Sequence, residues 1–559
     1  MRDSKSTLNL ITRRNFLSSS AKASMAVALS TLVDIPLVMK QALAEGNIGI
    51  PGPDGKKKKI LFIWLRGAND GLNSLIPILD TSYDASRPTL AIPPDAGTNY
   101  ATRGPADFSE SGSASTYGDY PFAIRTGNGF AALHPSLKFL APVYNPQPTK
   151  SSGNLALIHR VAYPRQSRSH FDSQRYWENG SPNNNLSNDG IFYRTMLEYL
   201  IDQGTNASPL TGVSIQSSLP LILRGSSAPM TNLTDPLRYD LLGVPTPGGD
   251  AKASLFLNQA NTYPFPDKLS RDLLQLQYDN MSTTLSQFAA IRSNFEEVGN
   301  TFQDDIKTDG DTAWVAPAGT GGIAGRGYFL FPTTNVKNGG WRRPDGSNDG
   351  GKYVVPPNLQ TLFERIKAAA VILNKTDALI AGTEYGGFDT HSQQGTLTGA
   401  HPDLNRGFGW AMYALQKYFS LYADKATWDN VVVVTLTEFG RTTIENADLG
   451  TDHAEANVMF VAGGAVKGFV PGSPNPVRSG VFNCGPTGSD PIGWTPGTGG
   501  AMFGVNGRYL SRVTDYRQVL GEIIRKHLGA TQNQLNRIIP GNGGPSTDGY
   551  QIRAELGIL

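Results

Sequence analysis

The sequence has few residues that could cross-link the chain and almost no net charge. Cys484 is its single cysteine among 559 residues, which excludes an intrachain disulfide. The 49 Lys and Arg residues nearly balance the 47 Asp and Glu residues, and the formal net charge is +2. Proteins that bind nucleic acid rely on a basic surface, whereas the one basic run here is the short Lys56–Lys59 segment. The charge balance therefore argues against a nucleic-acid partner.

The sequence also lacks a long uninterrupted hydrophobic run. The most apolar N-terminal stretch, Ala21–Met39, contains Asp34 and Pro36, whereas a membrane span needs about 20 mainly apolar residues. Arg13 and Arg14 precede this stretch, and the small-residue segment Ala42–Ala44 follows it. This layout is typical of a cleavable twin-arginine signal peptide over residues 1–44. An amphipathic N-terminal helix with a chance Arg pair is the alternative.

The signal predicts where the protein is found and what it meets on the way. We expect the twin-arginine export machinery to be a partner, and we expect a periplasmic or secreted mature protein without a transmembrane span. Residues 45–58 form a predicted linker rich in Gly and Pro. Because this route carries folded proteins, often with a cofactor already inserted, it favours a bound metal without proving one.

Short apolar runs alternate with helical patterns along the rest of the chain. Predicted strands are Ile60–Leu65, Leu155–His159, Ala378–Ala381, Val431–Leu436 and Val458–Gly464. Helical patterns cover about Phe171–Trp177, Leu359–Leu373 and Phe408–Tyr422. Runs that are apolar throughout are typical of strands covered on both faces of a parallel sheet. The sequence therefore predicts an α/β fold with a doubly wound, mainly parallel sheet flanked by helices.

This predicted α/β domain spans residues 59–559 and carries two insertions. Residues at about 91–130 and about 225–355 include long stretches rich in Gly, Ser, Asn, Asp and Pro, which we interpret as surface loops. The second insertion also contains a helical pattern over Asp267–Phe302.

Acidic and histidine side chains gather in the loops next to the predicted strands. Ligands bind at the carboxyl ends of strands in open parallel sheets. Three of the 7 histidines fall in these loops, each near an acidic residue. The candidate metal ligands are Asp70, Asp389, His391, Glu438, Asp452 and His453. We expect one or two divalent ions, because imidazoles favour zinc, manganese or iron over magnesium; calcium is a further candidate. The alternative is a polar network that ties the loops together.

The loop before the helical pattern at Phe171 combines hydroxyl and guanidinium groups. Ser167 and Ser169 alternate with Arg168, and His170 follows. A serine at a helix N-terminus beside arginine can bind a tetrahedral anion and act as a metal-activated nucleophile, but Ser169 can equally be a simple helix cap. His170 is a candidate ligand, general acid or structural residue. Arg441 is a candidate anion clamp or a partner for a carboxylate ligand.

At these loops the chain resembles the bacterial exported family called domain of unknown function 1501. The motifs that carry the resemblance are Leu65–Asn73, Arg168–Phe171, Phe388–His391, Glu438–Arg441 and Gly450–His453. That family looks similar to the alkaline phosphatase and sulfatase superfamily. The resemblance implies an alkaline phosphatase-like and sulfatase-like core with a two-metal phospho- or sulfohydrolase site.

The resemblance also implies roles for individual residues. Asp70 resembles the superfamily's first-strand ligand, the Ser167 and Ser169 loop its nucleophile position, and Asp389 with His391 its Asp-then-His pair. Asp452 with His453 resembles the Asp-His ligand pair. In a second alignment Glu438 takes the aspartate position and Phe439 the place of a histidine ligand, so two metals, one or none remain open.

The sequence thus predicts a metal-dependent hydrolase of phosphate or sulfate esters, acting on a small-molecule or glycan ester. Arg168 or Arg441 would offset charge on the ester oxygens. The alternative is a non-catalytic exported protein that binds a glycan or an envelope partner. The irregular loops and Phe439 favour this alternative, while the clustered histidines favour the enzyme.

Overall fold

The computed structural model describes most of the chain outside its N-terminus and its two insertions. The described residues are 48–49, 51–99, 122–146, 149–184, 189–203, 210–225, 230–235, 330–331, 357–473, 475, 479–486, 508–541 and 555–559. The predicted signal peptide and the helical pattern over Asp267–Phe302 lie outside them. Among the described helices, none combines the length and apolar character needed to cross a bilayer.

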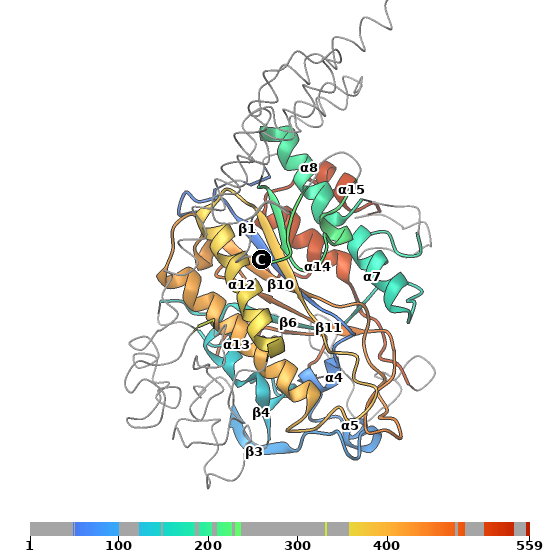
Figure 1. Ribbon diagram of the computed structural model, residues 1–559. Helices are drawn as coiled ribbons and strands as arrows, with labels where there is room; N and C mark the ends of the chain where they lie inside the picture. The colour runs from blue at the N-terminus through green and yellow to red at the C-terminus, as the bar shows by residue number, and fades with distance from the viewer. Residues whose placement is uncertain are drawn as a thin grey trace, which may run out of the picture.

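A large, mostly parallel sheet forms the centre of the described structure (Figure 1). Its strands follow the order β12-β6-β11-β10-β1-β9-β7-β8, and β13 also pairs with β6. The bounds are β1 Lys59–Leu65, β6 Leu155–Ala162, β7 Gly212–Ile215, β8 Thr231–Leu233, β9 Ile380–Tyr385, β10 Val431–Leu436, β11 Asn457–Ala462, β12 Val481–Phe482 and β13 Thr514–Asp515. The mixed α/β class and the mainly parallel sheet predicted from the sequence are confirmed.

Helices cover both faces of this sheet. They are α4 Gly71–Ser74, α5 Thr81–Ser86, α6 Ala141–Tyr144, α7 His170–Asn179, α8 Ile191–Gln203, α12 Pro357–Lys375, α13 Ala400–Leu421, α14 Tyr516–Glu522 and α15 Gln532–Ile538. Shorter turns are η3 Pro135–Leu140, η5 Leu221–Leu223, η7 Trp428–Asn430 and η8 Ile523–His527. In Figure 1, α12 and α13 lie on one side of the sheet, and α7, α8, α14 and α15 lie on the other.

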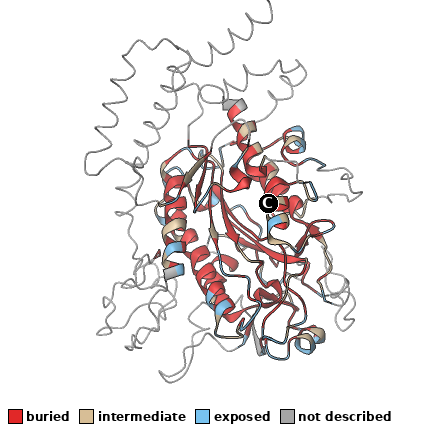
Figure 2. Ribbon diagram, turned by 45° about the vertical axis from the view of Figure 1, so that its right-hand side comes forward, coloured by how far each residue is buried: buried red, intermediate tan, exposed pale blue. Residues whose placement is uncertain are grey.

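Strand β1 shows why the sheet must be covered twice. All seven of its residues are buried, as the continuous apolar run predicts (Figure 2). Leu61 and Ile63 join the core beneath α12 and α13, while Phe62 and Trp64 join the core beneath α7, α8, α14 and α15. Successive side chains of a strand point to opposite faces. The apolar run Ile60–Leu65 within β1 therefore contributes side chains to both layers.

Strand β11 departs from the parallel pattern. It pairs antiparallel with β10 and with β6, whereas β1 pairs parallel with both β9 and β10. In a fully parallel sheet, a loop that precedes a strand lies at the opposite edge from the loops that follow strands. Because β11 is reversed, the loop before it reaches the same edge as the loops after β1, β6, β9 and β10.

The predicted surface loop at 91–130 contains short strands where it is described. β3 Pro94–Asn99 and β4 Ala123–Arg125 join β5 Ala132–Leu133 and β2 Leu75–Ile76 in a small second sheet. Ile124 is 1% exposed, and Phe130 is 2% exposed. The expectation of irregular loop throughout this segment is therefore wrong at its ends, because a few apolar side chains suffice to anchor strands too short for visible alternation.

Candidate metal centre

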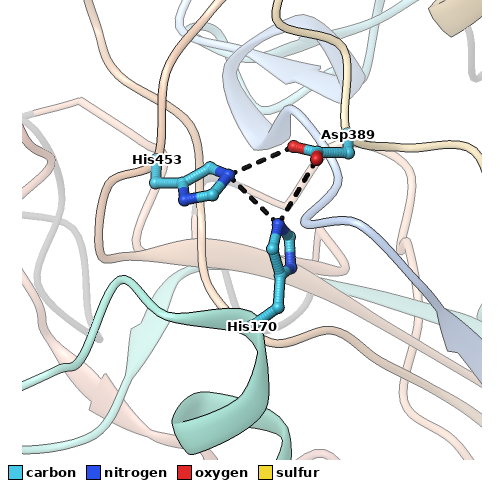
Figure 3. A group of neighbouring side chains, drawn as sticks. All are labelled: His170, Asp389 and His453. Carbon is cyan, nitrogen blue, oxygen red and sulfur yellow. Dashed lines mark hydrogen bonds and ion pairs between the residues drawn. The ribbon is translucent and has the colours of Figure 1, made fainter.

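Three side chains from distant parts of the chain converge at one edge of the main sheet (Figure 3). His170 begins α7, Asp389 lies in the loop after β9, and His453 lies in the loop before β11. His170 Nε2 lies 3.1 Å from His453 Nε2 and 3.5 Å from Asp389 Oδ2. His453 Nε2 lies 3.2 Å from Asp389 Oδ1. These separations suit donor atoms about 2.0–2.2 Å from one shared ion.

His391 lies beside this group. Its Nε2 atom lies 2.9 Å from His453 Nε2 and 3.1 Å from Asp389 Oδ1. His391 therefore contacts two members of the group that could share one ion, which is formed by His170, Asp389 and His453. The two imidazole nitrogens and the carboxylate of that group are donor types that zinc binds in proteins.

The opposite ring nitrogen of each histidine faces an oxygen acceptor. His453 Nδ1 lies 2.9 Å from the Arg168 carbonyl oxygen. His391 Nδ1 lies 3.3 Å from Asp452 Oδ1, and His170 Nδ1 lies 3.7 Å from Glu438 Oε1. An acceptor at Nδ1 favours the neutral tautomer whose proton is on Nδ1, which leaves the Nε2 lone pair directed inward.

Charge around Asp389 keeps this carboxylate ionised. Its partial burial alone would raise its pKa, but the positive charge of Arg441 and a hydrogen bond with His453 hold the pKa below its usual value. Arg441 is fully buried and donates from Nη2 to Asp389 Oδ1 at 2.8 Å. Arg441 thus occupies the position of a partner to a carboxylate ligand, one of the two roles that the sequence left open.

Glu438 lies next to Nδ1 of His170, on the side of the ring opposite Nε2. Burial alone would raise its pKa, but contact with His170 and nearby positive and N–H groups lower it. Its carboxylate accepts hydrogen bonds from Gly67 N at 3.2 Å and from Ala68 N at 3.2 Å. The contact with Glu438 is also the main cause that raises the pKa of His170. Glu438 therefore contacts His170 through its Oε1 atom and also contacts the loop after β1.

The loop after β1 passes very close to Asp389. Gly67 has φ of 104°, and a Cβ atom there would lie 2.4 Å from the backbone N of Asp389. Glycine alone fits this approach and this left-handed conformation without strain. The glycine of the Leu65–Asn73 motif is thus explained by its position against the metal-centre loop.

Phe439 stands beside the histidines but offers no ligand atom. It is fully buried, and its ring centroid lies 4.8 Å from that of His170 and 4.7 Å from that of His453. The aromatic ring packs against both imidazoles and restricts their rotation. At this position the chain has a buried aromatic ring, whereas the alternative alignment with the superfamily places a histidine ligand there.

Asp70 is not brought into this group of side chains. Arg87 donates to Asp70 Oδ2 at 2.6 Å and to Oδ1 at 3.0 Å, and Gln394 Nε2 donates to Oδ2 at 2.6 Å. Oδ1 also accepts from Leu72 N at the start of α4. Burial would raise the pKa of Asp70, but Arg87 lowers it to about 2. Arg87 and Gln394 were missed in the sequence because no periodicity or motif connects them to Asp70.

The serine loop lies next to His170 and has structural contacts of its own. Ser169 is the N-cap of α7 and accepts from Asp172 N at 3.5 Å, as in the capping interpretation. Ser167 Oγ accepts from Ser169 N at 3.2 Å and donates to Asp172 Oδ2 at 3.3 Å. Arg168 is half exposed, lies 3.7 Å from Glu455 and covers the ring of Tyr509. Their predicted catalytic roles stay predictions.

Backbone hydrogen bonds join the two loops that carry Asp389, His391 and His453, the candidate ligands. Thr451 N donates to Thr390 O at 3.1 Å, and Gln394 N donates to Leu449 O at 2.9 Å. Asn446 Nδ2 donates to His391 O at 2.8 Å. The loop after β9 and the loop before β11 therefore form one hydrogen-bonded unit, in which Asp389, His391 and His453 are held by the main chain.

The fold and the site together define an α/β protein with a histidine and aspartate centre at the edge of a mostly parallel sheet. A family model described as protein of unknown function (DUF1501) matches residues 273–476. The match covers Asp389, His391, Glu438 and His453 and supports the resemblance to this family over that part of the chain. No curated protein and no solved structure gave a significant match.

Proposed function

We propose that the protein is an exported metal-dependent hydrolase of phosphate or sulfate esters. The observation that carries the proposal is the convergence of the Nε2 atoms of His170 and His453 with the Asp389 carboxylate, with an oxygen acceptor behind each imidazole. Metal-binding histidines in proteins have such outer acceptors. The motif resemblance to the alkaline phosphatase and sulfatase superfamily supports the reaction class, and the twin-arginine pattern in residues 1–44 supports export.

His170, Asp389 and His453 would hold a single zinc or manganese ion, with His391 next to them. Such an ion would act as a Lewis acid on the ester and make a water or serine hydroxyl nucleophilic at neutral pH. Asp452 and Glu438 would fix the proton on Nδ1 of His391 and His170, as their positions behind the rings indicate. Asp70 has no part in this arrangement, because Arg87 balances its charge.

The serine loop would bind the anionic part of the ester. Arg168 keeps almost half of its side chain exposed, and its carbonyl oxygen contacts His453. Its guanidinium group would offset charge on the ester oxygens, while the N-terminus of α7 adds a favourable dipole. Ser169, the N-cap residue directly before His170, is our preferred nucleophile when the nucleophile is a side chain.

Elemental analysis of the purified mature protein tests the proposal. We expect about one equivalent of zinc or manganese in the wild type and loss of the metal in an Asp389→Asn/His453→Gln variant. Asp424→Asn is the matched control, since Asp424 is an exposed carboxylate paired with Lys375 before β10, at the other edge of the sheet. Metal-dependent hydrolysis of p-nitrophenyl phosphate or p-nitrophenyl sulfate would support the enzyme. Absence of metal from a well-folded wild-type protein would refute it.

A second candidate is a non-catalytic exported binding protein on the same scaffold. The position of Phe439 against the histidines and the neutralisation of Asp70 by Arg87 favour it, because both remove candidates for a second metal site. This alternative predicts that the metal-free double variant keeps its ligand affinity and that neither ester is cleaved. The hydrolase predicts that ester cleavage disappears together with the metal.

A further inference from the structure

A polar cavity is lined in part by α7, the helix that begins with His170. It has a volume of about 520 Å³, which falls within the range of small-molecule sites in proteins. Its walls come from the carboxyl ends of β1, β7 and β9, from α7 and from the segment around η5. Its lining includes Arg66, Phe171, Glu178, Gln216, Arg224 and Glu384.

Helix α7 connects the cavity with the metal centre. Phe171, Gln174, Arg175 and Glu178 line the cavity, and their spacing of three and four residues places them on one face of the helix. His170, the ligand residue, directly precedes Phe171. A ligand in the cavity would therefore lie along the helix whose first residue belongs to the metal centre.

The cavity lining carries more positive than negative charge. Arg66, Arg175 and Arg224 face only two lining carboxylates, Glu178 and Glu384. Arg66 holds both of them, at 3.3 Å from Glu178 and 3.2 Å from Glu384. Burial also raises the pKa of Glu178 to about 7, which weakens its negative charge at neutral pH. This excess favours an anionic ligand.

The cavity also offers groups suited to a ring with hydroxyl substituents. Gln216 is 3% exposed, and its Oε1 atom has no hydrogen-bond partner among the described residues. The Nη1 atom of Arg66 is likewise buried and unpaired there. A buried polar atom without a partner is costly, so a ligand hydroxyl would satisfy each one. Phe171 is 88% exposed and offers a flat apolar face at the rim.

We propose that this cavity binds an acidic saccharide, a sugar ring that carries a carboxylate or a sulfate group. Arg224 binds the anionic substituent, Gln216 and Arg66 bind ring hydroxyls, and Phe171 covers the apolar face of the ring. The role as a substrate subsite rests on the proposed hydrolase function, in which the saccharide is the organic part of the ester. The binding itself does not depend on catalysis.

Isothermal titration calorimetry on the mature protein tests this binding, with glucuronate, glucose 6-sulfate and glucose as probes. We expect at least one acidic sugar to bind about ten-fold more tightly than glucose, the effect of one charge-assisted hydrogen bond. The two acidic probes show whether a carboxylate or a sulfate is preferred. Arg224→Gln should remove most of this preference, and Phe171→Ala should weaken all three sugars.

Lys425→Gln is the control, because it removes one exposed positive charge that pairs with Asp377 just before β9, at the other edge of the sheet. Equal affinity for glucose and both acids, or acid binding unchanged in both cavity variants, would overturn the proposal. Asp389→Asn separates the two hypotheses: it should lose the metal while keeping saccharide affinity. Failure of the hydrolase would thus appear in metal content and ester cleavage, and failure of the cavity proposal in the titrations.

Discussion

Replacing Arg87 should destabilise the protein more than replacing any other charged residue near the site. Arg87 is fully buried and uses all three guanidinium nitrogens. Besides Asp70, they donate to Thr443 O at 3.0 Å, Asn73 Oδ1 at 2.7 Å and Thr442 O at 2.7 Å. An Arg87→Ala variant leaves Asp70 buried with its charge uncompensated. Removal of one partner of a buried pair typically costs about 3–5 kcal/mol.

Urea denaturation followed by tryptophan fluorescence measures this loss as a shift of the midpoint. An Arg87→Met/Asp70→Asn double variant should be more stable than Arg87→Ala, because the uncompensated charge is gone and the aliphatic chain fills the space. Folded Asp70→Asn should also keep its metal, since Asp70 lies outside the proposed ligand set. A loss below about 1 kcal/mol for Arg87→Ala, within the range of exposed ion pairs, would refute this reasoning.

Three further predictions concern pH, the support of the ligands and the buried aromatic ring. The pKa of Asp70 is lowered from 3.8 to about 2 in the folded protein. The ionised carboxylate therefore contributes about 2 kcal/mol to the free energy of unfolding above pH 4, and this contribution disappears as the pH falls through 2. Urea midpoints measured between pH 5 and 2 should show a smaller acid-induced loss of stability in Asp70→Asn than in the wild type. Glu438→Gln should weaken metal affinity about 10- to 100-fold, measured by competition with a chelator, and unchanged affinity would contradict its role behind His170. Phe439→Ala should lower the free energy of unfolding by about 3–5 kcal/mol, while Phe122→Ala, at a 38% exposed ring, should cost far less in the same denaturation assay.

The central strands could be predicted because they are apolar at every position. Val431–Leu436 was predicted at the bounds that β10 has, and β1 begins one residue earlier than expected. The predicted strand at Ala378–Ala381 is β9 Ile380–Tyr385, displaced because Thr383 and Glu384 interrupt the apolar run. Strands β7, β8, β12 and β13 have two to four residues each and leave no readable pattern. Their position depends on pairing with longer neighbours.

The sequence predicts which loops carry the candidate site residues, but not which side chains pair with one another. The proximity of His170, Asp389, His391 and His453 was predicted from their position next to strands. His453 lies at the shared edge because it precedes the reversed strand β11. The prediction of a mainly parallel sheet did not include this reversal. The pairing of Asp70 with Arg87 depends on side-chain packing between loops. Such contacts have no period and no fixed spacing.

The hydrogen bonds between the loop after β9 and the loop before β11 affect how tightly the candidate centre would bind an ion. Because Thr390, Gln394, Leu449 and Thr451 hold the loops through main-chain atoms, the ligand side chains are preorganised. Little of the binding free energy would go into ordering the loops, which favours high affinity from few contacts.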